Sequence, residues 1–493
     1  MKRTRKWPTS LLLAGIVFVG GDAAARGGKD KKRVPGQMNV ILLGKTQLLA
    51  DAKAFRRFCK KNAGRKRSEL RTEIVAQLKE IAKKEQAAIL KAMGSPKGAR
   101  SLWVVNAIAL SLSVGEIEKA RKLKQVKWVY PANNLPAEGP AGSVGVVLEP
   151  GRREPFSAKR KTIPWNIKKL NVPKVWKELK ITGEGVVVAM FDQGINYKHE
   201  DLRGNIWINE KEKPNNGEDD DQNGLVDDYY GFNFTHHKAE VAPVGGNHGT
   251  LTSSVVAGDG TGGTVTGVAP RAKLMGLIAW GGPYVAARAF QYALEQGADI
   301  VSMSFSIPGL GHTRGLWRLM AEQATCAGLV LISGAGNFQR KAKIPVQIRI
   351  PEGIPCVICI GGVNEKMKIP RFVSFGPVEW SKVKFYEDYP MPKGLVKPDV
   401  CAFPGPKIGL ISPRADTGYL PDNNQFHGNS LSAPHVAGVC ALILQANPEL
   451  LPWRIKEILE ETATDIRPRG KDTETGAGLV HAYKAVQKAL EEK

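Results

Sequence analysis

Short apolar runs alternate with helical stretches from Ile163 to the C-terminus, and this alternation constrains the fold more than any other feature. The runs fall at residues 185–192 (GVVVAMFD), 272–280 (AKLMGLIAW), 298–306 (ADIVSMSFS), 328–337 (GLVLISGAGN) and 356–363 (CVICIGGV). Continuous apolar strands interleaved with helices are typical of a mostly parallel sheet that is covered on both faces. The sequence therefore predicts an α/β fold with a mostly parallel sheet for residues 163–493.

A second, smaller domain is predicted at residues 38–135. A strand, two helical segments, a hairpin-like run, a helix and a final strand follow one another there, at residues 38–43, 48–62, 68–93, 102–113, 114–123 and 126–131. The order strand, helix, strand, strand, helix, strand is the split βαβ plan. The sequence therefore predicts a small α+β, ferredoxin-like domain ahead of the larger one.

The N-terminus has the pattern of an export signal. Residues 1–25 combine a basic start, a short apolar run and three alanines, Ala23 to Ala25, which is typical of a signal peptide. The run is too short for a stable membrane span, and the alternatives are an uncleaved anchor or a chance apolar start. A polar, basic stretch follows at residues 26–37. We expect a secreted or periplasmic protein.

The two predicted domains are joined by residues 136–162, which are rich in Gly, Pro and basic residues and lack periodicity. Such a composition predicts a linker, and exposed linkers are where proteolytic cutting concentrates. We therefore expect a processing site in this segment.

The formal net charge of +24 is distributed unevenly along the chain. Residues 1–162 hold 35 Lys and Arg against 12 Asp and Glu, whereas the remaining residues hold 36 against 35. A nucleic-acid groove on the larger domain is therefore not expected. The basic N-terminal third could still contact anionic surfaces.

Six cysteines are present, five of them beyond residue 162, so an exported chain would keep at least one thiol free. Cys356 and Cys359 have the spacing of a redox or zinc motif, but no second Cys/His pair completes a site. They also lie in an apolar run that is typical of a buried strand. We interpret the thiols as small core residues and leave any disulfide pairing open.

Four polar residues lie where strands are predicted to end or helices to begin. Asp192 follows the run at 186–191, His248 follows a glycine-rich turn, Asn337 closes LISGAGN, and Ser430 precedes an apolar helix. A carboxylate, an imidazole, an amide and a hydroxyl are the groups of nucleophilic catalysis with an oxyanion hole. Taken singly, each is more often a turn, loop or helix-capping residue.

The order Asp, His, amide, Ser resembles that of the subtilisin-like serine proteases, the subtilases. The chain has segments similar to the family's aspartate, histidine, oxyanion and serine motifs, namely VVVAMFDQGINYKHEDL, NHGTLTSSVVAG, LISGAGN and GNSLSAPHVAG. GVAPRAKL, KPDVCAFPG and GAGLVHAYKAV are also similar to family segments, and residues 38–135 resemble the family's inhibitory propeptide. The resemblance covers nearly the whole chain.

The resemblance implies specific roles for these residues. Ser430 would attack the scissile carbonyl, His248 would take and return the proton, and Asp192 would fix the imidazole tautomer. Asn337 and the Ser430 backbone amide would bind the oxyanion. His435 and Ser432 match structural positions.

Three residues depart from the family pattern beside these positions. Leu251 replaces a histidine, Asn429 a threonine and Gln193 a small hydroxyl residue. These departures make the efficiency of the site uncertain, but none removes a member of the triad.

Substrate would bind beside these residues. Ser304, Phe305 and Ser306 form an edge on which an extended peptide could pair as an added strand. Ser306 stands where the family has glycine, which adds a side chain near the pocket for the residue before the cut. The turn residues Gly334, Ala335 and Gly336 are expected to complete this surface.

An acidic segment, EDDDQNGLVDD, has the alternating oxygen ligands and turn glycine of a calcium loop. Tyr230 occupies the place of the distal glutamate of a full EF-hand, and many subtilases have a similar, calcium-binding stretch. The alternative is a solvated acidic loop. The predicted ligands of this structural calcium are Asp219, Asp221, Asn223, Leu225, Asp227 and Asp228.

Together these features predict an exported, calcium-supported serine endopeptidase without a catalytic cofactor. It would act on protein or peptide substrates and be made as a self-processing zymogen with its propeptide as intramolecular inhibitor. One alternative is a weakly active or inactive protein with the same fold that binds peptides. Another is a protein that binds anionic surfaces through its basic N-terminal third.

Overall fold

The computed structural model describes residues 36–132, 135, 143–148, 156–308, 310–342, 347–378, 395–466 and 468–493. The predicted signal peptide and nearly all of the polar stretch after it lie outside these residues. So do residues 136–142 and 149–155 of the predicted linker.

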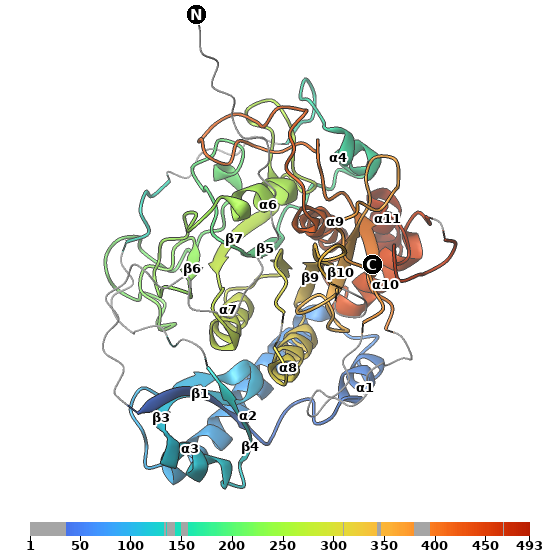
Figure 1. Ribbon diagram of the computed structural model, residues 1–493. Helices are drawn as coiled ribbons and strands as arrows, with labels where there is room; N and C mark the ends of the chain where they lie inside the picture. Colours follow the sequence, from blue (N-terminus) through green and yellow to red (C-terminus); the bar gives the residue numbers. More distant parts are fainter. Residues whose placement is uncertain are drawn as a thin grey trace, which may run out of the picture.

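The larger part of the chain is built on a seven-stranded parallel sheet (Figure 1). Its strand order is β11-β10-β9-β8-β5-β7-β6, and every recorded pairing between neighbours is parallel. The predicted parallel sheet is therefore confirmed. The strands are β5 (Val187–Phe191), β6 (Gly231–Asn233), β7 (Lys273–Ile278), β8 (Ile300–Met303), β9 (Val330–Gly334), β10 (Ile358–Gly362) and β11 (Val400–Ala402).

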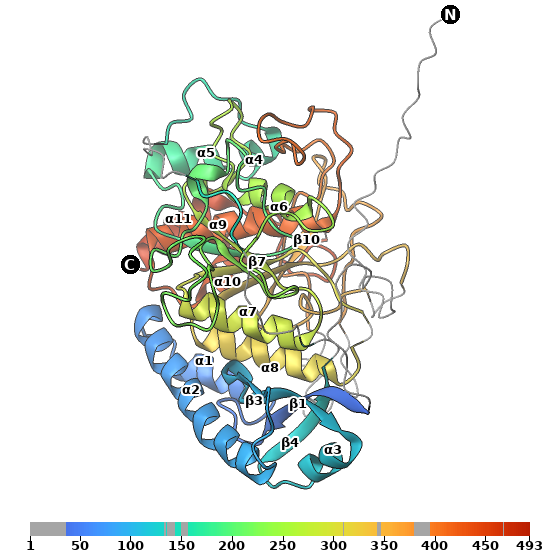
Figure 2. The same cartoon turned by 90° about the vertical axis from the view of Figure 1, so that its left-hand side faces the viewer.

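Helices cover both faces of this sheet, which explains why every residue of β8, β9 and β10 is buried. One face carries α6 (His248–Ala257) and α9 (Ser432–Ala446), with α11 (Ala482–Glu491) packed on α9. Figure 2 places α7 (Pro283–Glu295), α8 (Thr313–Cys326) and α10 (Pro452–Thr462) on the opposite side. The shorter elements are α4 (Trp165–Lys169), α5 (Val172–Lys174), η2 (Val175–Leu179), η3 (Arg203–Asn205) and η4 (Asn429–Leu431).

The N-terminal unit, residues 36–132, is a four-stranded antiparallel sheet in the order β2-β3-β1-β4, with its helices beside it. This agrees with the small α+β domain predicted from the sequence. Its elements are β1 (Gln37–Gly44), α1 (Ala54–Lys61), α2 (Arg67–Ala92), β2 (Arg100–Leu102), η1 (Trp103–Val105), β3 (Ala107–Ser113), α3 (Val114–Arg121) and β4 (Val126–Pro131).

Alternation along β1 divides the N-terminal unit between two hydrophobic cores. Val40 and Leu42 belong to a small core of the unit itself, whereas Ile41 and Leu43 belong to the core that continues into the larger part of the chain. Successive side chains of a strand point to opposite faces. One face of this sheet therefore packs within the unit and the other packs against the main body.

Two arginines of α2 fix the N-terminal unit to the ends of α7 and α8. Arg67 pairs with Asp299 at 2.7 Å, and both side chains are only 12% exposed. Arg71 donates from Nη2 to the carbonyl of Ala298 (2.5 Å) and from Nε to that of Ala327 (3.3 Å). These carbonyls follow the C-termini of the two helices, where the helix dipole favours a cation.

The cysteines behave as the composition predicted. Cys59 is half-buried and the other five are buried, and all six thiols are free. Burial raises the pKa of Cys356 and Cys359, because the charged thiolate is poorly solvated there. These two thiols pack as core residues.

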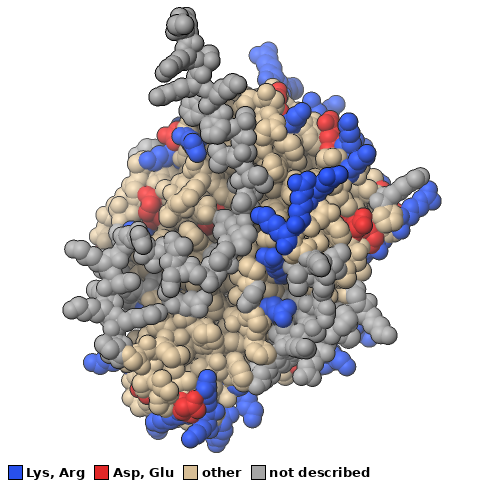
Figure 3. Space-filling view, in the orientation of Figure 1, with Lys and Arg blue, Asp and Glu red and all other residues tan. Residues whose placement is uncertain are grey.

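Charge is spread over the surface of both parts. In Figure 3, Lys and Arg side chains gather at the lower end, over the N-terminal unit, and again at the upper right, over the main body, with acidic side chains among them. Within the described ranges, no helix has the length and apolar character needed to cross a membrane.

Candidate active site

Asp192 and His248 meet at the end of the sheet. Asp192 directly follows β5, and His248 is the first residue of α6. His248 Nδ1 lies 2.7 Å from Asp192 Oδ1 and 2.9 Å from Oδ2. The Thr252 hydroxyl donates to Oδ2 (3.0 Å) and the Gln193 backbone N–H donates to Oδ1 (2.8 Å). Both carboxylate oxygens are thus held in place, and the imidazole is held by them.

The carboxylate determines how His248 handles a proton. Burial lowers the pKa of His248, but the charge of Asp192 and its hydrogen bond outweigh burial, so the pKa lies above its ordinary value. Because Nδ1 faces the carboxylate, it carries the proton, and Nε2 keeps its lone pair. The ring is therefore suited to accept a proton at Nε2.

Ser430 does not cap helix α9. It lies in the 3-10 turn η4, and the residue at the helix N-cap is Leu431, which makes no side-chain capping hydrogen bond. Helix α6 packs beside η4, so the segments that carry His248 and Ser430 are neighbours. Between the described residues, no hydrogen bond joins the Ser430 hydroxyl to His248. Such catalytic hydrogen bonds are often long without substrate and tighten when it binds.

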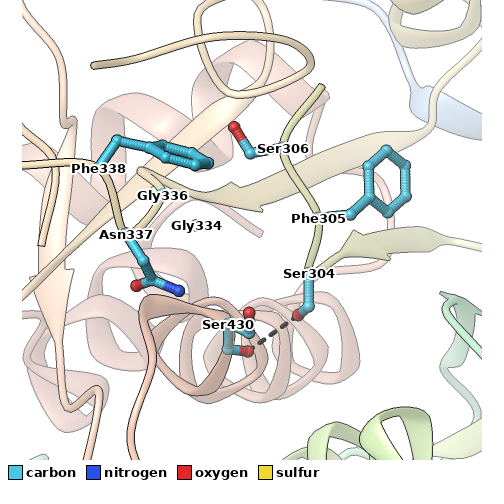
Figure 4. Close-up of a pocket in the computed structure, with 8 residues that line it drawn as sticks. All are labelled: Ser304, Phe305, Ser306, Gly334, Gly336, Asn337, Phe338 and Ser430. Atoms are coloured by element: carbon cyan, nitrogen blue, oxygen red, sulfur yellow. Dashed lines mark hydrogen bonds between the residues drawn. The ribbon is translucent and has the colours of Figure 1, made fainter. Parts of the chain in front are cut away.

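Asn337 is oriented by the turn that holds Ser430. Its Oδ1 accepts a hydrogen bond of 2.7 Å from the backbone N–H of Asn429. The amide nitrogen must then point the other way, and Figure 4 shows it directed toward Ser430. An amide donor placed beside a nucleophilic hydroxyl is suited to stabilise a developing oxyanion.

A small pocket opens in front of Ser430 and Asn337. A second hollow, lined by Phe191, Asp192, Gln193, Ala279 and Trp280, shares two of its walls with the first. The hollow beside Asp192 and the pocket beside Ser430 are therefore neighbours, and they share Ser304 and Phe305 at the end of β8. The first pocket is lined by Ser304, Phe305, Ser306, Gly334, Gly336, Asn337, Phe338 and Ser430.

Two turn residues behave differently around this pocket. Ala335 is buried and its backbone N–H donates to the Ile360 carbonyl at 2.8 Å, so it supports the pocket from behind. At Gly334, a Cβ would lie 2.5 Å from the Asn429 carbonyl oxygen, which only glycine avoids. The close approach keeps the Asn337 turn against the Ser430 turn.

Two of the residues that depart from the family pattern, Asn429 and Leu251, are buried beside the site. Asn429 is buried, and its side-chain nitrogen donates to the Ile360 carbonyl (2.7 Å). Leu251 is buried in the core. His435 bonds the Leu431 carbonyl (2.7 Å) and Asn166 (2.9 Å), and burial lowers its pKa to about 4, so it stays neutral and structural.

Sequence reasoning missed three residues of this region. Phe338 lines the pocket and directly follows Asn337, so its position in the chain could have indicated it. Thr252, which orients Asp192, lies one helical turn after His248. Behind the pocket, Glu352 accepts a hydrogen bond from the Ser306 hydroxyl. The two residues are 46 positions apart, so no local sequence pattern connects them.

The acidic loop brings together two of the predicted metal ligands and one that was not predicted. Oxygen atoms of Glu212, Asp219 and Asp221 lie within 4.8 Å of one another. Glu212 Oε2 is buried and has no hydrogen-bond partner, and burial together with the neighbouring aspartates raises the pKa of Glu212. An unpaired buried carboxylate oxygen among acidic neighbours fits a bound cation.

The other four predicted ligands are engaged within the loop. Both carboxylate oxygens of Asp227 accept backbone N–H groups, from Asn216 and Gly217, at 3.1 Å. The Asn223 side chain donates to Asp228 (3.1 Å), and Leu225 is buried with its N–H on the Asn223 side chain (2.8 Å). Burial raises the pKa of Asp228 to about 7.

Comparisons with known proteins agree with this geometry. The model of the subtilase family matches residues 183–478, which is more than half of the chain. The chain is 26% identical over 353 residues to fervidolysin of Fervidobacterium pennivorans, an alignment that covers 66% of this chain and 44% of that protein.

Two further relatives are similar over comparable lengths. Subtilisin-like protease 1 of Plasmodium berghei is 24% identical over 318 residues, covering 63% of this chain and 51% of that protein. Alkaline elastase YaB of Bacillus sp. (strain YaB) is 27% identical over 333 residues, covering 66% of this chain and 71% of that protein. The chain thus spans about half the length of the first two relatives.

Proposed function

The chain belongs to the subtilase family, and from that membership we propose that it is a serine endopeptidase. The single observation that carries the proposal is the His248–Asp192 hydrogen bond of 2.7 Å, in a cleft whose adjoining pocket is lined by Ser430 and Asn337. The proposal is supported by the hydrogen bonds that hold Asp192, His248 and Asn337 in place. The experiment that tests it compares the wild type with Ser430→Ala and opens the Discussion.

The proposed reaction begins when Ser430 Oγ attacks the carbonyl carbon of the scissile bond. His248 Nε2 takes the hydroxyl proton and later gives it to the leaving amine. Asp192 holds the imidazole and stabilises its charged form, supported by the Thr252 hydroxyl. A water molecule then attacks the acyl carbon while His248 Nε2 takes its proton, and His248 returns that proton to Ser430 Oγ as the acyl–oxygen bond breaks.

The oxyanion of the tetrahedral intermediate would be bound by the Asn337 side-chain nitrogen and the Ser430 backbone N–H. Asn429 N–H fixes the Asn337 amide before substrate arrives, so no reorganisation is needed when charge develops. This preorganisation is what makes such donors effective.

Replacing Asn337 by leucine, which has a similar volume, is expected to lower kcat by about 10²–10³-fold with little change in KM. The donor acts on charge that exists only in the transition state, so substrate binding is largely spared. Steady-state kinetics on a peptide substrate measure both constants. An equal rise in KM would instead assign Asn337 to substrate binding. Asn423→Leu, at an exposed position, is the control.

We also propose a structural calcium ion in the acidic loop, held by Glu212, Asp219 and Asp221, with the other predicted ligands supporting the loop. When bound, the ion neutralises carboxylates that otherwise repel one another. Its contribution would be to stability, because the loop supplies no group to the proposed catalytic cleft.

Chelation of calcium is expected to lower the thermal midpoint, and Glu212→Gln is expected to reduce the difference between the calcium and EDTA midpoints. At calcium a hundredfold above its Kd, binding adds about 2.7 kcal/mol to the free energy of unfolding. Glu218→Gln, an exposed acid of the same loop, is the matched control. Thermal melts of inactive Ser430→Ala chains avoid self-digestion. Equal midpoints with and without calcium would refute the site.

We further propose that the N-terminal unit is an intramolecular inhibitor and that the linker is cut during maturation. The sheet of this unit shares a core with the main body, and Gln323 of α8 donates to the Val104 carbonyl (2.6 Å) across the contact. The same proposal includes export of the chain directed by residues 1–25. It also includes proteins or peptides as the substrates of the mature enzyme.

Arg67→Ala is expected to weaken retention of the cut N-terminal unit by about 30- to 150-fold in Kd. The substitution removes hydrogen bonds to a partly buried charge and to the Pro448 carbonyl, which together contribute about 2–3 kcal/mol. Size-exclusion chromatography of Ser430→Ala chains with the linker opened by an added protease measures it. Lys79→Ala removes an exposed pair with Glu295 and should change little. Equal retention of both variants would exclude a role of Arg67 in holding the cut N-terminal unit.

A further inference from the structure

The pocket next to Ser430 is closed at its far end by two side chains. Figure 4 shows Ser306 and Phe338 at the end of the pocket that lies opposite Ser430. Ser306 is 6% exposed and Phe338 is 2% exposed, so both fill space and expose little of themselves. A substrate side chain that enters beside Ser430 meets this wall.

A buried carboxyl group lies directly behind Ser306. Glu352 accepts hydrogen bonds from the Ser306 hydroxyl and from the Arg349 backbone N–H (2.9 Å). Its side chain is fully buried, and Oε2 has no hydrogen-bond partner. Burial raises the pKa of Glu352 to about 7. The carboxyl fixes the Ser306 hydroxyl, and Ser306 in turn covers the carboxyl.

Phe338 is held in place by a hydrogen bond to its backbone and by close contacts to its ring. Its backbone N–H donates to the Ser374 hydroxyl (2.9 Å), and the Arg349 guanidinium lies over the ring at 3.5 Å. A Cβ at Gly336 would lie 2.9 Å from the ring, which shows how closely the ring covers this turn. The wall is therefore a fixed part of the pocket.

We propose that Ser306, Phe338 and Glu352 restrict the residue before the cleaved bond to small side chains, namely glycine, alanine and serine. Ser306 and Phe338 are specificity-determining because they face the substrate side chain. Glu352 is a positioning residue that acts through Ser306. This inference rests on the proposed endopeptidase function.

The competing hypothesis is that Glu352 binds a basic substrate side chain directly. The carboxyl is fully buried and Ser306 covers it, so a lysine could reach it only if Ser306 were displaced. Removing the Ser306 side chain should therefore create a specificity that the wild type lacks.

The test measures kcat/KM for four peptides that differ only in the residue before the cut: alanine, leucine, phenylalanine or lysine. The enzyme is the full chain after self-processing, verified by intact mass. The wild type is expected to prefer alanine over phenylalanine and lysine by about 100-fold. Its own cut in the linker should also follow a small residue, although the linker contains Arg152–Arg153 and Lys159–Arg160–Lys161.

Ser306→Gly is expected to raise kcat/KM for the leucine and lysine peptides at least tenfold relative to alanine. The double variant Ser306→Gly/Glu352→Gln should keep the gain for leucine and lose that for lysine. A merely structural role would lower all four values together and leave their ratios unchanged. If the glycine variant does not fold, Phe338→Ala opens the same wall and should raise kcat/KM for the leucine peptide relative to alanine; Glu365→Gln, an exposed acid, is the control.

Several results would overturn the inference. The proposed restriction is refuted if the wild type cleaves the phenylalanine or lysine peptide with the same kcat/KM as the alanine peptide. If the double variant Ser306→Gly/Glu352→Gln keeps the gain in kcat/KM for the lysine peptide, the role proposed for Glu352 is refuted. If no peptide is cleaved, the endopeptidase proposal fails, and competitive binding of the four peptides to Ser430→Ala, with its linker opened, still ranks them. Equal binding of all four would then refute the restriction itself.

Discussion

Ser430→Ala is expected to leave the chain at full length under conditions in which the wild type sheds its N-terminal segment. Both proteins, expressed without residues 1–25 and incubated with calcium, are compared by intact mass. If Ser430 is the nucleophile, loss of its hydroxyl oxygen should slow cleavage by about 10⁶-fold, the effect that removal of the catalytic serine has in subtilisin. At that rate, self-processing falls from complete to undetectable.

The neighbouring serine provides a matched control for this substitution. Ser432 begins helix α9, two residues after Ser430, and its hydroxyl is buried without a hydrogen-bond partner. Removing an unpaired hydroxyl should be nearly neutral for stability. Ser432→Ala is therefore expected to process itself like the wild type.

The other outcomes are equally informative. If Ser430→Ala is cut as readily as the wild type, an outside protease opens the linker, and a general peptide substrate must replace self-processing as the readout. If neither is cut and neither cleaves that peptide, the endopeptidase proposal fails and the alternative of a peptide-binding protein with the subtilase fold is favoured.

The sequence was sufficient for the centre of the sheet because the central strands are long apolar runs. β5, β7, β8, β9 and β10 all fall within predicted runs, whereas β6 and β11 do not. Three residues are too few to show any period, and these two strands lie at the edges of the sheet, where neighbours and not composition define them. Local pattern therefore predicts the centre of the sheet better than its edges.

The same distinction applies to the site. Asp192, His248, Asn337 and Ser430 each follow or precede a regular element, which made them candidates, and the resemblance to the subtilases implied their roles. Glu352 is connected to Ser306 only by the folded chain, and the same holds for Glu212 and the aspartates of the acidic loop. Arg67 and Asp299 likewise pair across 232 residues. Contacts between distant segments have no local signal.

Asp192→Asn is expected to lower kcat by about 10⁴-fold while the chain stays folded. The amide can present its NH₂ group to His248 Nδ1, which then becomes the acceptor and moves the ring proton to Nε2. With Nε2 protonated, His248 can no longer take the proton of Ser430. Single-turnover kinetics on an acyl ester measure the step directly. Asp422→Asn, at an exposed position, is the control.

The pH profile of this variant gives a second, independent readout. Activity needs neutral His248, so kcat/KM rises with pH as the imidazole loses its proton. In the wild type, Asp192 outweighs burial and raises the pKa of His248 above its ordinary value of about 6.5. In Asp192→Asn the burial remains and the carboxylate charge is gone, so the rise in residual activity should move to lower pH. A rise that stays at the wild-type pH would mean that Asp192 does not control the protonation of His248, and its role would be limited to holding the ring.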